Sequence, residues 1–236
     1  MNTRDCKSVA AMIGTGVFAG VLGFSVAPAP HAAADTCPDV DVVFARGTNE
    51  APGPGGIGEA FVDAVRTKAG PKTVSVHPVD YAASADFADS MQFAMTVIDG
   101  IRDATTHIQT TAANCPATRI VLGGFSQGAV VAGFTTAAEV PDGVPAAFVP
   151  PPMPPEVANH VAAVALFGKP SNTFLADAGA PLITLGPLYV PKTIDLCATG
   201  DTICNGAGPG APSPEHNSYI ADGMVNQAAE FAVGRL

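Results

Sequence analysis

Short apolar runs alternate with longer segments of helical periodicity along most of the chain. Five runs are mainly apolar and span residues 39–47, 72–81, 119–124, 161–168 and 181–186. Apolar runs of this length are typical of strands that are buried on both faces, as in a parallel sheet covered by helices. The pattern therefore predicts a mainly parallel sheet.

The segments between these runs have apolar residues at helical spacing. Residues 56–70 predict a helix that stops at Gly70, just before Pro71. A longer helix is predicted within residues 89–116, and the last helix within 218–236. The long helix has one apolar face, formed by Met91, Met95, Ile98, Ile101, Thr105 and Ile108. Strand–helix alternation predicts a three-layer α/β sandwich.

Residues 1–34 have the pattern of a secretory signal. Arg4 and Lys7 precede an uncharged apolar run, and Ala32 to Ala34 supply the small residues of a cleavage site. An uncleaved anchor is the alternative, because the apolar run is nearly long enough to span a bilayer. The glycines of the run and the prolines after it favour cleavage. We expect a secreted or cell-wall-associated domain of residues 35–236, without stable membrane insertion.

Length and composition limit the number of domains and the class of partner. The chain has 236 residues, a formal net charge of −10 and no cluster of Lys or Arg. Such an acidic chain argues against nucleic acid and anionic lipid headgroups as partners. The proline-rich residues 149–157 are too short for an interdomain linker, and we interpret them as a stiff connection within one domain.

Four of the five cysteines lie within residues 35–236. In an exported domain they indicate two disulfides, for which three connectivities are possible. Cys197 and Cys204 are close in sequence and are expected to pair, which leaves Cys37 to pair with Cys115. No Cys-x-x-Cys motif or histidine pair has the spacing of metal ligands. We therefore expect no metal site.

The segment Gly124-Phe125-Ser126-Gln127-Gly128 places one hydroxyl between two glycines. An apolar run precedes it and a small-residue helical segment, residues 129–140, follows it. This is the pattern of a nucleophile elbow, in which a serine lies on a strained strand-to-helix turn. The flanking glycines are needed because side chains there would clash with neighbouring backbone. The following helix N-terminus would offer N–H groups to an oxyanion.

A nucleophilic serine needs a base. His216 follows a glycine- and proline-rich loop and opens the last predicted helix, where it can be presented at the edge of the sheet. It is the candidate base. The other histidines of the domain are interpreted as packed or surface side chains: His77, His107 and His160.

The acid of such a set lies between the serine and the histidine in chain order. Asp195 and Asp201 both fall in that interval. Asp201 lies inside the small loop between Cys197 and Cys204, which can hold a carboxylate rigidly. Asp195 lies in a strand-like segment and is interpreted as structural. Asp201 is therefore the candidate acid.

A glycine-rich segment raises a different possibility. Residues 53–58 match G-x-G-x-x-G, and Asp80 follows at roughly the distance seen in dinucleotide-binding sites. The motif should follow directly on a strand, but residues 48–52 intervene, and an exported protein has no obvious supply of NAD. A flexible glycine loop is the better interpretation, so no organic cofactor is expected.

Taken together, these segments make the sequence similar to the cutinase family, in particular to its mycobacterial cutinase-like branch. The similarity covers essentially all of residues 35–236. Its markers are VVFARGTNE, RIVLGGFSQGA, VAAVALFGKP, LGPLY, LCATGDTIC and HNSYIADGM. The resemblance implies a single-domain α/β-hydrolase with a mainly parallel sheet and no large lid.

The resemblance also implies roles for individual residues. Ser126 would be the nucleophile, Asp201 the acid and His216 the base, as the residues themselves indicate. It adds an oxyanion hole formed by the N–H of Gln127 and by the N–H and hydroxyl of Thr48. The family's two disulfides match Cys37–Cys115 and Cys197–Cys204. Phe125 stands where tyrosine is more usual in the family, which affects substrate preference rather than the chemistry.

The implied activity is hydrolysis of carboxylic esters with short- to medium-chain acyl groups, or of lipids, by a monomeric enzyme. Alternatives on the same residues are an acetylxylan-type deacetylase and a phospholipase or thioesterase. A non-catalytic surface protein would be expected to have lost one of the three residues. We expect substrate preference to depend on loops at residues 81–90, 171–180 and 205–215.

Overall fold

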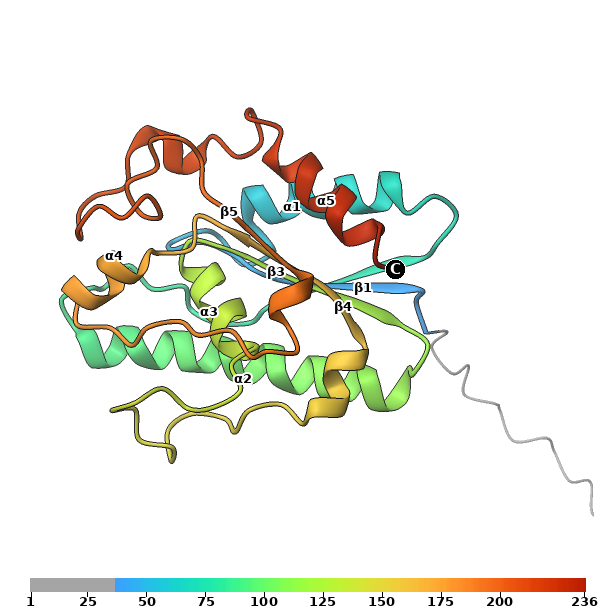
Figure 1. Ribbon diagram of the computed structural model, residues 1–236, viewed down its shortest axis with the longest axis horizontal. Coiled ribbons are helices and arrows are strands. Elements are labelled where there is room, and N and C mark those ends of the chain that lie inside the picture. Colours follow the sequence, from blue (N-terminus) through green and yellow to red (C-terminus); the bar gives the residue numbers. More distant parts are fainter. Residues whose placement is uncertain (1–36) are drawn as a thin grey trace, which may run out of the picture. The chain divides into compact units, whose positions relative to one another are not determined.

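Five parallel strands form one sheet in the order β2-β1-β3-β4-β5 (Figure 1). The computed structural model describes residues 37–236, and the predicted signal sequence lies outside them. The strands are β1 (Val40–Ala45), β2 (Val74–Pro78), β3 (Arg119–Phe125), β4 (Val161–Phe167) and β5 (Thr193–Leu196). The three central strands are almost entirely buried, as their unbroken apolar sequences predict.

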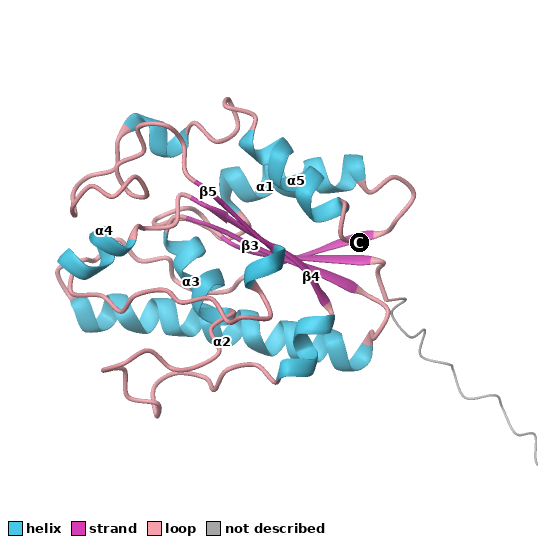
Figure 2. Ribbon diagram, in the orientation of Figure 1, coloured by secondary structure: helices cyan, strands magenta, loops and turns pink. Residues whose placement is uncertain are grey.

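Helices cover both faces of the sheet (Figure 2). The long helices are α1 (Gly55–Lys68), α2 (Ser90–Asn114), α3 (Gln127–Thr135) and α5 (Met224–Val233), and α4 (Asn172–Asp177) is short. Helices α1 and α5 pack in one hydrophobic layer and α2 and α3 in the other. Successive side chains of a strand point to opposite faces of the sheet. In β1, Phe44 packs in the layer of α1, and Val43 and Ala45 pack in the layer of α2 and α3. The predicted three-layer α/β fold is confirmed.

The last predicted strand is in the wrong place. Residues 181–186 form no strand; Ile183 lies within contact distance of Gly133 on α3, and the Gly186 N–H donates to the carbonyl of Thr136. The run therefore meets the α3 region through Ile183 and Gly186, and its other residues are exposed or only partly buried. The edge position beside β4 is taken by β5, whose sequence has the strand-like character noted around Asp195.

Two further expectations need correction. The last helix begins at Met224, so His216 does not open it but lies in a separate 3-10 helix, Pro214–Asn217. The proline-rich residues 149–157 are not purely a connection, because a 3-10 helix, Pro155–Asn159, begins within them.

Both expected disulfides are present. Cys37–Cys115 joins the segment before β1 to the end of α2, and Cys197–Cys204 closes a short loop after β5. No helix among residues 37–236 has the length and apolar character needed to cross a membrane.

The topology selects one end of the sheet for a site. Strands β1 and β3 are neighbours, but the chain leaves β1 toward β2 and leaves β3 toward β4. Crevices at the carboxyl ends of strands form at such switch points. Thr48 follows β1 and Ser126 follows β3, so both lie at this crevice.

Candidate active site

Ser126 lies on a sharp turn between β3 and α3. Its backbone dihedrals are φ 53° and ψ −116°, a region that residues with a side chain rarely adopt. The glycines two positions before and after it are sterically required. A Cβ at Gly124 would lie 2.1 Å from the carbonyl oxygen of Gly128, and a Cβ at Gly128 would lie 1.9 Å from the carbonyl oxygen of Ala45. The Ser126 N–H donates to the carbonyl of Phe167 on β4 (2.8 Å). The turn thus has the strained geometry of a nucleophile elbow.

Asp201 and His216 form a buried pair. The carboxylate oxygen Oδ2 of Asp201 lies 2.8 Å from Nδ1 of His216, and the side chains are 0% and 6% exposed. The second oxygen, Oδ1, accepts the N–H of Ile203 (2.9 Å). The pair thus uses Nδ1 and leaves Nε2 of the imidazole as the nitrogen available for proton transfer.

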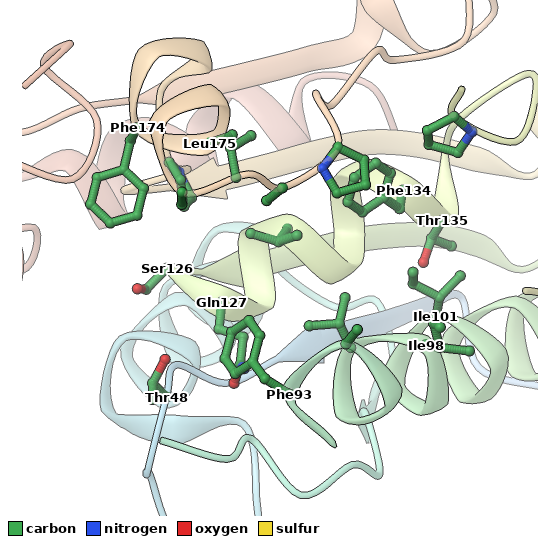
Figure 3. Close-up of a pocket in the computed structure, with 18 of the residues that line it drawn as sticks. Thr48, Phe93, Ile98, Ile101, Ser126, Gln127, Phe134, Thr135, Phe174 and Leu175 are labelled. Atoms are coloured by element: carbon green, nitrogen blue, oxygen red, sulfur yellow. The ribbon is translucent and has the colours of Figure 1, made fainter. Parts of the chain in front are cut away.

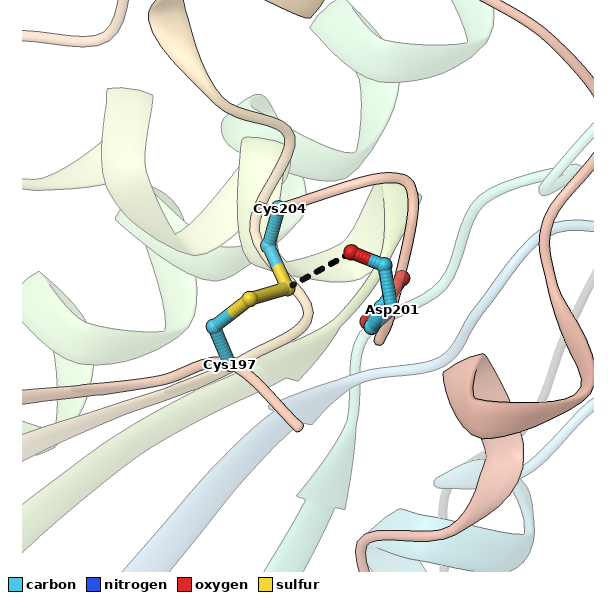
Figure 4. Close-up of side chains that lie close together, drawn as sticks. All are labelled: Cys197, Asp201 and Cys204. Carbon is cyan, nitrogen blue, oxygen red and sulfur yellow. Dashed lines mark hydrogen bonds between the residues drawn. A yellow bond between two sulfur atoms is a disulfide. The ribbon is translucent and has the colours of Figure 1, made fainter. Parts of the chain in front are cut away.

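The disulfide Cys197–Cys204 lies beside Asp201 (Figure 4). The two sulfurs and the carboxylate are close enough to suggest a metal cluster. Because the sulfurs are bonded to each other, they are not thiolate ligands, and this group offers no metal site. Its structural effect is to constrain the loop that carries the acid.

Tyr219 is a member of this site that sequence reasoning missed. Its fully buried hydroxyl donates to Oδ2 of Asp201, the oxygen that also contacts His216. Burial, and then the hydrogen bond to Asp201, raise the pKa of Tyr219 well above the usual value of tyrosine, so the hydroxyl stays a donor. The sequence signal was its place in HNSYIADGM, three residues after His216.

Glycine is required at one more position near the pair. Gly168, directly after β4, has φ 57°, and a Cβ there would lie 2.9 Å from both Cε1 of His216 and the Tyr219 hydroxyl. On its other side the imidazole packs against Phe125, with ring centroids 4.8 Å apart. The phenyl ring before the nucleophile therefore contacts the candidate base.

Ser126 and His216 line the same cavity but are not hydrogen-bonded to each other in the described part of the chain. Catalytic hydrogen bonds are often long or misaligned before substrate binds. Thr48 and Gln127 line this cavity too, so it contains every residue that the sequence assigns to catalysis except the buried Asp201. Figure 3 shows the hydroxyls of Ser126 and Thr48 at one end of it.

The candidate oxyanion hole has a rigid support that sequence reasoning also missed. The buried guanidinium of Arg46 donates to the carbonyls of Glu50 (3.0 Å) and Tyr81. The carboxylate of Glu50 accepts the N–H of Gly47 (2.6 Å). The loop that carries Thr48 is thereby held at both ends. The N–H of Gln127 lies in the first turn of α3, where backbone donors have no intrahelical partner.

The glycine-rich segment 53–58 is not arranged as a dinucleotide site. Residues 55–58 are the first turn of α1, and the Gly56 N–H donates to Glu50 (2.8 Å). A carboxylate thus already lies where a pyrophosphate would bind at the helix N-terminus. The segment is part of the support for the Thr48 loop.

The other candidates lie away from the cavity. Asp195 is half-exposed and pairs with Lys169 (3.2 Å). His77 is paired with Asp103 of α2 and His107 with Asp41 of β1, and His160 follows the 3-10 helix before β4. None of these residues lines the cavity that contains Ser126.

Comparison with known proteins identifies the family. The family model described as Cutinase matches residues 36–236. The chain belongs to the cutinase family. It is 56% identical over 183 residues to the probable carboxylesterase Culp5 of Mycobacterium tuberculosis, covering 78% of this chain and 99% of the relative. It is 46% identical over 234 residues to the carboxylesterase Culp1 of Mycobacterium bovis, covering 98% and 97%.

Solved structures agree with this family. A Trichoderma reesei cutinase in complex with a phosphonate inhibitor is 27% identical, with a TM-score of 0.61 over 84% of this chain and 76% of that one. The catalytic core of an acetyl xylan esterase from Trichoderma reesei has a TM-score of 0.65 over 85% and 100%, and at 23% identity this shows the fold alone. The chain is thus a cutinase-like carboxylic ester hydrolase with an α/β-hydrolase fold.

Proposed function

We propose that this chain is a secreted serine esterase in which Ser126, His216 and Asp201 form the catalytic triad. The carrying observation is the buried Asp201–His216 pair, whose imidazole shares a cavity with a serine on a strained strand-to-helix turn. Two disulfides in so small a domain, and the signal pattern of residues 1–34, support an exported protein.

The reaction follows from these positions. His216 accepts the Ser126 proton through Nε2 while the hydroxyl oxygen attacks the ester carbonyl carbon. Asp201 holds the ring with Nδ1 protonated and stabilises the imidazolium. The imidazolium then protonates the departing alcohol, which leaves an acyl-enzyme, and a water activated by the same histidine releases the acid.

The oxyanion donors would be the N–H groups of Gln127 and Thr48, with the Thr48 hydroxyl as a third donor. Both residues border the cavity beside Ser126. The loss of one such donor typically lowers kcat by about 10² to 10³. Thr48→Val, which keeps the shape and removes the hydroxyl, tests the side-chain contribution against Thr48→Ser, which retains it.

The deciding experiment compares residues 35–236 with their Ser126→Ala variant on p-nitrophenyl butyrate. Turnover should fall by about 10⁴ or more in the variant, and a phosphonate ester should add its mass to the wild type but not to the variant. Wild-type activity should increase from acid to neutral pH, because a histidine that acts as general base must be unprotonated. Equal turnover by both proteins, or a flat profile between about pH 5 and 8, would contradict the triad.

The same proposal places the mature N-terminus near Asp35. The mass of the protein recovered from the culture medium checks this, because cleavage after Ala34 removes a fragment of defined mass. An intact N-terminus in a membrane fraction would favour the anchored alternative.

A further inference from the structure

The cavity beside Ser126 extends far beyond what a short acyl group would fill. It has a volume of about 880 Å³. An apolar cavity of about 150 Å³ is enough to hold one benzene ring. The cavity therefore has room for an acyl chain much longer than butyrate.

The length of this cavity can be estimated from the two helices that line it. Its lining residues follow one face of α2 at spacings of three or four, from Phe93 through Val97 and Ile101 to Thr105. They also follow α3 from Ser126 to Thr135. At 1.5 Å per residue, these stretches span about 18 Å and about 14 Å. Figure 3 shows Ser126, Thr48 and Gln127 at one end and Ile98, Ile101 and Thr135 at the other.

The outer wall is a cover segment, residues 137–154, which joins α3 to the next 3-10 helix and passes alongside α2 (Figure 1). Six of its residues are proline. Because proline restricts φ, this wall is stiff and the space is largely preformed. Val144 and Pro150–Pro152 line the cavity, and Met153 anchors the segment in the core.

The chemistry of the lining suits a hydrocarbon. The polar residues along α2 and α3 beyond the catalytic end are Thr105 and Thr135, and the Thr135 hydroxyl already donates to the carbonyl of Val131 (2.8 Å). Glu139 of the cover segment is exposed to solvent. A sugar or other polar group placed here would leave its hydroxyls without partners, which is costly in a buried site.

The orientation follows from the oxyanion donors. The N–H of Gln127 is at the first residue of α3, so a carbonyl bound there lies over the start of that helix. The acyl chain then extends along α3 and beneath the cover segment. The alcohol is then left at the Ser126 end of the cavity, where Figure 3 shows Phe174.

We infer that this enzyme acts on esters of long-chain fatty acids, whose acyl chain is buried between α2, α3 and the cover segment. An extended chain advances about 1.2 Å per bond, so the space accepts about 12 to 15 bonds. This inference rests on the proposed function, and it replaces the short- to medium-chain preference expected from the sequence with a longer one.

The test measures kcat/KM on p-nitrophenyl esters of 4 to 18 carbons, each kept below its aggregation concentration. The wild type should improve with each added methylene, by up to about fourfold, to an optimum near 12 to 16 carbons. In Ile101→Phe the ring fills the channel one helical turn nearer to Ser126 than in Thr105→Phe. The optimum of Ile101→Phe should therefore be about five carbons shorter than that of Thr105→Phe.

Thr106→Phe is the matched control, because Thr106 is the exposed neighbour of Thr105 and does not line the cavity. Its chain-length profile should equal that of the wild type. Circular dichroism and melting temperature check that each variant folds, and Val144→Phe on the cover segment replaces any α2 variant that does not.

Three results are distinguishable. Serine-dependent turnover that decreases steadily from four carbons onward would overturn the inference and leave the triad standing. Identical profiles in wild type, Ile101→Phe and Val144→Phe would do the same. Turnover that is unaffected by Ser126→Ala at every chain length would overturn the proposed function itself.

Discussion

Two regions of the molecule bring together the same three residue types. At the carboxyl ends of the strands, Ser126 and His216 share a cavity and His216 is bound to Asp201. Between α2 and the neighbouring strands β1 and β2, Ser75 of β2 and His107 of α2 are both bound to Asp41 of β1. Only the first region has the arrangement of an active site, so the residue types alone do not distinguish them.

The first difference between the two regions is which residue the serine hydroxyl contacts. In the group around Asp41 the serine hydroxyl donates directly to the aspartate, and the histidine contacts the same aspartate instead of the serine. The second difference is the ring nitrogen that is engaged. His107 uses Nε2 to contact Asp41 (2.6 Å), whereas His216 uses Nδ1 and leaves Nε2 toward the cavity.

The neighbours of the two imidazoles also differ. His107 stacks on His77 with centroids 3.7 Å apart and planes 6° from parallel, and His77 contacts Asp103 (2.7 Å). Every polar side chain of this group thus has a polar partner within the group, which ties α2 to the edge of the sheet. In each group one imidazole nitrogen contacts a carboxylate, but only His216 borders a cavity that also contains a serine hydroxyl.

The strongest test of this comparison replaces each of the two histidines by alanine in a separate variant. His216→Ala should lower kcat/KM for p-nitrophenyl esters by about 10⁴ or more, because the base is lost. His107→Ala should change it by less than about threefold. A comparable loss in both variants would break the distinction.

Asp41→Asn tests the structural role through stability. Burial opposes ionisation of Asp41, but hydrogen bonds from His107 and Ser75 outweigh it and lower the pKa of this carboxyl. Its charged form therefore stabilises the fold above about pH 4, and this contribution is lost as pH falls through the lowered pKa. The free energy of unfolding in urea should decrease by about 2 kcal/mol at pH 7, and the difference from the wild type should shrink near pH 3.

The matched control for that experiment is Asp63→Asn. Asp63 pairs with Arg66 on the surface of α1, where both side chains are at least half exposed. Such a pair contributes about 0.5 kcal/mol or less. If Asp63→Asn lowered the free energy of unfolding as much as Asp41→Asn, the buried network around Asp41 would not stabilise the fold more than a surface ion pair does.

Tyr219→Phe tests whether the tyrosine hydroxyl contributes to catalysis through Asp201. The phenyl ring retains the packing against Phe125 and Phe167, but the donor to Asp201 is lost. We expect kcat/KM to fall about tenfold, which corresponds to about 1.4 kcal/mol of barrier. The half-maximum of the pH profile should move to higher pH, because a carboxylate with one donor fewer holds the imidazolium more strongly.

A purely structural role of Tyr219 would lower stability and leave the pH profile in place. Measuring the profile and the melting temperature on the same preparation separates the two cases.

The smallest expected effect is that of Ser75→Ala. This hydroxyl supports Asp41, so its loss should reduce the free energy of unfolding by about 1 kcal/mol. Esterase activity should stay within about twofold of the wild type. A large loss of activity would indicate that the network near β2 communicates with the active site.

Much of the fold was predictable from local pattern. Four of the five predicted strands and the positions of α1, α2 and α5 follow from runs of apolar residues and from helical periodicity. The failure at residues 181–186 has a physical reason: only Ile183 and Gly186 of this run are buried, Ile183 against Gly133 of α3, and Leu182 is exposed, so an apolar sequence here does not correspond to a buried strand.

The candidate site was predictable to different degrees. The turn at Ser126 was readable from the two glycines beside it, although the contact that requires Gly128 is with Ala45 of β1 and only the one that requires Gly124 lies within the turn. The loops expected to influence specificity do border the cavity, through Phe87, Phe174 and Pro212. The proline-rich end of the cover segment, within residues 149–157, was interpreted as a connection, because nothing in its composition tells which helices it lies against.

By itself, the sequence determined what depends on short stretches of chain: the strands, the long helices, the elbow at Ser126 and the small disulfide loop around Asp201. Tertiary structure alone decided what depends on distance through space. It placed Tyr219 on Asp201, gave Asp41 its partners in β2 and α2, and brought residues 137–154 to the wall of the long cavity. Such contacts join residues far apart in sequence, and they arise only when the layers pack.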